Sequence, residues 1–142
     1  MGKVKLSMDD MALIAKFEQI TGAPASDVIA EEERLIFVVK GKHLADAIGH
    51  QGSNVKKAAE IFEKEIDIVE AADNPEDFVK NALSPARVKE VNIREQKNGR
   101  KIASVKVNDK DRGIAIGKQG RNVARAQVLV QRHFDVNQVV ID

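Results

Sequence analysis

The spacing of hydrophobic residues predicts the same order of elements in each half of the chain. Between residues 7 and 20 apolar side chains recur every three or four positions, as on one face of a helix. Short apolar runs bounded by polar residues predict strands, and longer stretches with helical spacing predict further helices. For the first half the predicted elements are a helix at 7–20, strands at 28–30 and 35–39, a short helix at about 43–48, a longer helix at about 53–64 and a strand at 66–69.

The second half repeats this order with an opening helix of its own. Asn74 is predicted to cap that helix, and Pro75 follows at its first position. Asn98-Gly99 is predicted to supply the positive φ angles of a tight hairpin turn. The predicted elements are a helix at 75–83, strands at 88–94 and 102–107, a short helix at about 110–116, a longer helix at about 121–133 and a strand at 136–141.

The first helix carries explicit start and stop signals. The Ser7 hydroxyl and the Asp10 carboxylate are spaced to form a capping box. Leu6 and Met11 stand at the positions of a hydrophobic staple. After the last apolar position, Ile20, the chain continues as Thr21-Gly22-Ala23-Pro24, and we expect the helix to end there.

A short motif occurs at the same place in both halves. Gly49-His50-Gln51-Gly52 and Gly117-Lys118-Gln119-Gly120 are each preceded by Ala-Ile, and after one residue each is followed by Asn-Val. Matching positions are 68 residues apart, so the chain is predicted to contain two similar domains, 1–72 and 73–142. Units of this size bury only about 60% of their unfolded surface. We therefore expect the two to share an interface.

Positive charge gathers around both glycine motifs, although the net charge is only +1. Residues 1–72 hold nine Lys or Arg and thirteen Asp or Glu, whereas residues 73–142 hold fourteen and nine. Even in the acidic half, the stretch 40–57 has four lysines and one aspartate. A local basic patch of this kind indicates nucleic-acid binding.

The composition excludes several classes of protein. Hydrophobic residues are 43% and charged residues 32% of the chain, which is ordinary for a globular protein. The chain has no cysteine, so disulfides, thiolate metal sites and cysteine nucleophiles are absent. No apolar run approaches the roughly 18 residues of a membrane span, and the first residues contain no signal-peptide core. We expect a cytoplasmic protein without a membrane partner.

A turn with two glycines separated by two residues suits contact with a polynucleotide backbone. Glycine has no Cβ to hold the sugar-phosphate chain away. We expect the amides at the start of the following helix to be unpaired and to favour an anion. We also expect Lys56, Lys57, Arg121 and Arg125 to lie in solvent beside the loops. The candidate RNA-binding residues are Gly49, His50, Gln51, Gly52, Asn54, Lys56, Lys57, Lys110, Arg112, Gly117, Lys118, Gln119, Gly120, Arg121, Asn122 and Arg125.

These motifs resemble those of the KH domain in its bacterial-type order, in which a helix and a hairpin precede the glycine loop. The resemblance implies an α+β fold with two tandem type II KH domains, each a three-stranded mixed sheet covered by helices. KH domains clamp about four single-stranded nucleotides. We therefore expect single-stranded RNA as the partner.

The segment between the two motifs narrows the resemblance to one family. Glu65-Ile66-Asp67-Ile68-Val69 and the run 73–86, which contains the linker helix 75–83, are similar to the linker between the KH domains of NusA, a transcription termination and antitermination factor. The chain has no room for the polymerase-binding and β-barrel regions of bacterial NusA, so it resembles the short archaeal form. His50 replaces the more usual cation of the first loop. The family implies nascent transcript as the RNA, with RNA polymerase or other transcription factors as possible further partners.

No set of residues indicates catalysis, a cofactor or a metal. The segment Gly113–Lys118 differs from a nucleotide-binding P-loop, because it has three residues between its glycines and Gln119 after the lysine. Ser53–Lys56 matches S-x-x-K without the companion motifs. The three histidines share no metal-ligand spacing. We therefore expect a protein that is not an enzyme, has no cofactor and binds no metal.

Two other functions remain open from the sequence. A tandem KH protein that acts in ribosomal RNA processing or on the ribosome would use the same chemistry on another RNA. A protein-interaction scaffold could keep the KH fold without holding RNA. We expect the protein to be a monomer.

Overall fold

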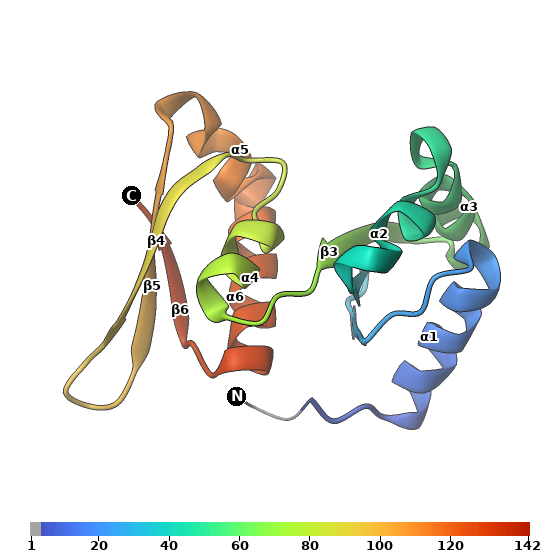
Figure 1. Cartoon of the computed structure of the whole chain (residues 1–142), viewed down its shortest axis with the longest axis horizontal. Coiled ribbons are helices and arrows are strands. Elements are labelled where there is room, and N and C mark those ends of the chain that lie inside the picture. The colour runs from blue at the N-terminus through green and yellow to red at the C-terminus, as the bar shows by residue number, and fades with distance from the viewer. Residues whose placement is uncertain (1–3) are drawn as a thin grey trace. The chain divides into compact units, whose positions relative to one another are not determined.

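The structure, a computed structural model, describes residues 4–142 and consists of two compact units (Figure 1). One unit is formed by Lys5–Ala71 and the other contains Ala72–Asp142. The predicted domain boundary, between residues 72 and 73, lies one residue from this division. Residues 1–3 of the predicted first domain are outside the described part of the chain.

The first unit is a three-stranded mixed sheet with three helices. Its elements are α1 (Met8–Thr21), β1 (Asp27–Ala30), β2 (Arg34–Val39), α2 (Gly41–Ile48), α3 (Ser53–Phe62) and β3 (Glu65–Glu70). Strand β2 is central; it pairs antiparallel with β1 and parallel with β3. The predicted capping box of α1 is confirmed, since the Asp10 amide donates to Ser7 Oγ at 3.0 Å and the Ser7 amide donates to Asp10 Oδ2 at 3.1 Å. Gly22 ends the helix in a left-handed conformation, as predicted.

Alternate residues of β2 build the core of the first unit against all three helices. Leu35, Phe37 and Val39 belong to one buried cluster with Phe17 of α1, Ala47 of α2 and Ala58 of α3. The rings of Phe17 and Phe37 stack with centroids 4.0 Å apart. The helices that flank the glycine motif are thus fixed to the sheet by burial of apolar side chains.

The second unit repeats this architecture. Its elements are α4 (Pro75–Ala82), β4 (Val88–Glu95), β5 (Lys101–Val107), α5 (Arg112–Ile116), α6 (Arg121–Phe134) and β6 (Gln138–Ile141). Strand β5 pairs antiparallel with β4 and parallel with β6. The predicted cap of α4 is confirmed, because Asn74 Oδ1 accepts from the Asp77 amide at 2.8 Å. Helices α4 and α6 lie on the same side of the sheet (Figure 1).

Three details of the second unit differ from the sequence prediction. Residues 109–111 form a 3₁₀ turn, so the short helix begins at Arg112 instead of 110. Strand β6 begins at Gln138 instead of 136, because Asp135 takes a left-handed conformation and the Val136 amide still donates to Val130 O in α6. The hairpin turn spans three residues, since the Gln96 amide donates to Arg100 O, and Gly99 alone has a positive φ there. A three-residue loop of this kind needs one left-handed residue at its end.

Helices of the second unit cover the sheet with apolar side chains at helical spacing. Phe78 and Val79 of α4 and Leu129 and Val130 of α6 are fully buried or nearly so. In β5 the alternate residues Ala103 and Val105 are completely buried. No helix in residues 4–142 is both long enough and apolar enough to span a membrane.

Candidate nucleic-acid interface

The two glycine loops adopt the same backbone conformation. Gly49 has φ 77° and ψ 169°, and Gly117 has φ 78° and ψ 167°. The closing glycines also agree, with φ 76° and ψ 17° at Gly52 and φ 74° and ψ 15° at Gly120. The loop conformation therefore depends on the shared motif, since the surrounding residues differ between the units.

A glutamine in each loop occupies a region that side chains rarely adopt. Gln51 has φ 53° and ψ 31°, and Gln119 has φ 58° and ψ 27°. A non-glycine residue in this left-handed region costs about 1–2 kcal/mol. Such outliers gather at binding sites, where the surrounding structure maintains them. Both glutamines are exposed to solvent.

The asparagine after each loop ties the loop to the helix before it. Asn54 Nδ2 donates to Asp46 O at 2.6 Å, and Asn122 Nδ2 donates to Ile114 O at 2.7 Å. Each amide thus bridges the end of the short helix and the start of the longer one. Both asparagines are predicted from the sequence to contact RNA, and these hydrogen bonds give them a role inside the protein as well.

The first glycine of each loop lies directly against this asparagine. A Cβ added to Gly49 would stand 2.7 Å from Asn54 N, and one added to Gly117 would stand 2.8 Å from Asn122 Cγ. Neither contact is possible between real atoms. The glycine is therefore required by close packing within the loop as well as by its φ angle.

The expectation of unpaired amides at the start of the longer helices is wrong for four of them. The Gly52 amide donates to Gly49 O at 3.1 Å, and the Gly120 amide donates to Gly117 O at 3.0 Å. The amides of Ser53 and Arg121 donate to the first central residue of their loops. The 3₁₀ turn satisfies these donors because its bonds close after three residues.

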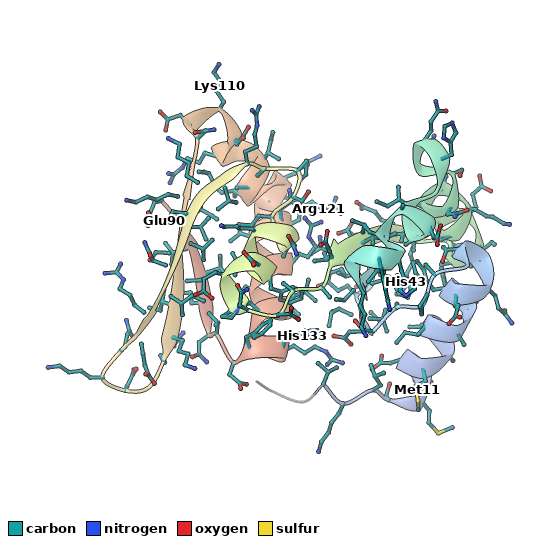
Figure 2. All side chains as sticks on the ribbon, viewed as in Figure 1. Met11, His43, Glu90, Lys110, Arg121 and His133 are labelled. Carbon is teal, nitrogen blue, oxygen red and sulfur yellow. The ribbon has the colours of Figure 1, made fainter. Side chains whose placement is uncertain are left out.

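The central side chains of both loops are exposed, and cations flank both loops in the sequence. His50, Gln51, Lys118 and Gln119 are all exposed. Of the other candidate cations, Lys56, Lys57, Lys110 and Arg112 are exposed and Arg121 is half-buried. Lys110 extends into solvent from the turn before α5 (Figure 2). Arg112 Nη2 lies 3.5 Å from Ile141 O, which brings its guanidinium close to the end of β6.

The prediction that Arg125 lies in solvent is wrong. Arg125 is only 8% exposed. Its guanidinium donates to Ala82 O from Nε at 3.0 Å and from Nη2 at 2.8 Å, and to Ser84 O from Nη2 at 3.1 Å. Ala82 is the last residue of α4 and Ser84 follows it, so both carbonyls lie where a helix leaves acceptors without intrahelical partners. Arg125 therefore joins α6 to the end of α4.

Sequence reasoning missed two apolar side chains beside the loops. Ile48, immediately before Gly49, is 38% exposed, and Ile114 of α5 is 44% exposed. Helical periodicity assigns an isoleucine at such a position to the core, so hydropathy alone gives no signal for them. In residues 4–142 no group of three or more His, Asp or Glu side chains could hold a metal ion.

Both units match models of known domain families. Residues 14–73 match the KH domain, and residues 75–141 match the NusA-like second KH domain. A protein of Halococcus morrhuae named "Probable transcription termination protein NusA" is 38% identical over 138 residues, which are 96% of this chain and 98% of that protein. The chain belongs to the NusA family.

Further NusA relatives and a solved structure agree with this assignment. The "Probable transcription termination protein NusA" of Methanocaldococcus jannaschii is 33% identical over 99% of this chain and 76% of that protein. A chain known from a crystal structure has a TM-score of 0.86 and 37% identity, over 96% of this chain and 100% of the other. The predicted fold, two tandem KH domains with three-stranded mixed sheets, is confirmed. The names of these NusA relatives are those of transcription proteins and not of enzymes.

Proposed function

We propose that this NusA-family chain binds single-stranded RNA through its two G-x-x-G loops and acts on nascent transcript during termination or antitermination. One observation carries the proposal. Two loops of the same conformation each present two exposed polar side chains, next to exposed lysines. The names of the relatives support a role in transcription termination.

Each group at the loop has a distinct part in the proposed complex. The first glycine of each loop has no side chain, so the RNA backbone can approach the loop closely. Lys56 and Lys57 in the first unit, and Lys118 in the second, neutralise phosphate. The exposed Ile48 and Ile114 offer apolar surface to bases. The KH domain of this type clamps about four nucleotides, so two loops correspond to about eight.

A direct test is the affinity for a pool of single-stranded RNA at several salt concentrations. If about four phosphates are neutralised, log K should fall against log salt with a slope near −3. A flat response would remove the electrostatic part of the proposal, and no binding at low salt would favour a protein scaffold. Crosslinking in cells would then separate nascent transcript from ribosomal RNA, the alternative substrate.

The second loop is expected to contribute more affinity than the first. Replacing Lys118 and Gln119 by aspartate should weaken RNA binding by about tenfold or more, because a cation is lost and two anions face the phosphates. The same change at His50 and Gln51 should cost less. All four side chains are exposed, so unfolding should be unchanged in both variants. Equal losses, or a larger loss in the first loop, would contradict this order.

Asn122 is expected to act by positioning the loop. Asn122→Ala removes the hydrogen bond to Ile114 O, so affinity should fall several-fold as the loop loosens. The slope of log K against log salt should stay as in the wild type, because no phosphate contact is lost. Asn54→Ala should behave alike in the first unit. A shallower salt slope in either variant would mean that the asparagine contacts RNA directly.

A further inference from the structure

We infer that each KH unit holds the RNA backbone at a second place, a basic hollow beside the start of the short helix that precedes its glycine loop. The inference rests on the proposed function, because it extends the same RNA strand beyond the loop. The ligand is the phosphate of the continuing single strand.

The hollow of the second unit lies where the chain enters β4 and leaves β5. Its volume is about 460 Å³, and its lining residues are Arg87, Lys89, Asn108, Asp109, Lys110 and Asp111. Arg87, Lys89 and Lys110 are all exposed. The lining thus brings together cations from two segments that are about 20 residues apart in the sequence.

One of the two carboxylates in this hollow is already engaged by the protein. Asp111 is 7% exposed, and its Oδ2 accepts from the Arg87 amide at 3.0 Å and lies 3.4 Å from Arg87 Nε. The Arg87 side chain is still 83% exposed. Asp111 therefore stabilises the wall of the hollow. Asp109 is the lining carboxylate that is exposed to solvent.

The first unit has a hollow at the corresponding place. Its volume is about 240 Å³, and its lining residues are Pro24, Ala25, Ser26, Lys40, Lys42 and His43. These residues also precede the first strand and follow the second. Lys42 and Lys110 occupy the same position of the repeat, each seven residues before the first glycine of its loop. No carboxylate contributes to this lining.

The recurrence in two units with different sequences indicates that the hollow belongs to the KH unit and carries a preserved positive charge. It is also close to the loop along the chain. Seven residues at helical rise span on the order of 10 Å. In the second unit the exposed Ile114 lies between Lys110 and Gly117 in the chain, on the short helix that joins the hollow to the loop. A strand clamped at the loop can reach the hollow within a few nucleotides.

The experiment compares two RNA lengths with one variant that removes lysines from both hollows. The variant carries Lys40→Gln and Lys42→Gln in the first unit and Lys89→Gln in the second, all at exposed positions that the loops do not use. For a strand of about twelve nucleotides, affinity should fall by about tenfold, as expected when two exposed ion pairs are lost. The salt slope should become shallower by about 1.4, which is two phosphates at 0.7 each. For a strand of about four nucleotides, affinity should stay within about twofold.

A matched control removes charge away from the hollows. Lys80→Gln with Lys97→Gln changes one exposed lysine on α4 and one at the hairpin end of β4. This control should leave the affinity for both RNA lengths unchanged. The inference would be overturned if the lysine variant lost the same affinity for both RNA lengths or lost none for the longer strand. It would also be overturned if the control variant lost as much affinity for the longer strand. The replacement of Lys118 and Gln119 by aspartate tests the proposed function separately from this inference, because it should weaken the binding of both RNA lengths.

Discussion

Replacing the first glycine of both loops by alanine is expected to reduce RNA affinity by at least about a hundredfold. The paired variant is Gly49→Ala with Gly117→Ala. Each added Cβ would lie less than 3 Å from the asparagine that follows the loop, so the turn cannot keep its shape. The backbone angles, with φ near 78° and ψ near 168°, also fall in a region that is essentially restricted to glycine.

The closing glycines provide the matched control. Gly52 has no neighbour within 4 Å of an added Cβ, and Gly120 has only Val123 Cγ1 at 3.9 Å. Their angles are left-handed, a conformation that alanine reaches at a cost of about 1–2 kcal/mol. Gly52→Ala with Gly120→Ala should therefore bind RNA within about tenfold of the wild type. Titration with a labelled strand measures both. Similar losses in the two variants would show that packing against the asparagine is unimportant.

The second large effect is expected on stability, at Arg125. Arg125→Met should lower the free energy of unfolding of the second unit by about 2–3 kcal/mol, because the carbonyls at the end of α4 lose a buried charged donor. Methionine keeps much of the apolar volume of the arginine side chain, so the decrease in the free energy of unfolding measures the contribution of the guanidinium group. Urea unfolding followed by circular dichroism measures it.

Lys57 is the natural control, since it occupies the position of Arg125 in the first unit, 68 residues earlier. Its side chain is exposed. Lys57→Met should therefore leave unfolding within about 0.5 kcal/mol of the wild type. It should make the salt slope for RNA shallower by about 0.7 if it contacts one phosphate. Arg125→Met should leave that slope unchanged under conditions where the protein is folded. Unchanged stability of Arg125→Met would refute the structural role given to this arginine.

The order of elements could be predicted because its determinants are local. Ser7 and Asp10 lie one helical turn apart, and Asn74 and Asp77 have the same spacing, so each cap forms from residues that the sequence already places together. The strands of both sheets follow from short apolar runs between turns. The expectations of a shared interface between the domains, of a monomer and of a cytoplasmic location remain predictions.

The loop prediction was right about the positions of the glycines and wrong about the free amides that follow them. The two glycines were identified from their spacing and repeat. The hydrogen-bond partner of each asparagine amide could not be identified in this way, because the same amide could donate to RNA or to a carbonyl eight residues earlier in the chain. The amides of Gly52 and Gly120 were expected to be free, but a 3₁₀ turn uses them, and the motif does not distinguish that turn from an open one.

Hydrophobic spacing, caps and glycine content act over a few residues, so the repeated succession of helices and strands and the two glycine turns can be inferred from the sequence. The environment of the charged residues depends on the folded arrangement of the helices. Lys57 and Arg125 occupy equivalent positions on equivalent helices, yet one is exposed and the other is buried. The difference comes from the end of α4, which lies 43 residues before Arg125 in the chain and brings carbonyls that only a nearby donor can satisfy.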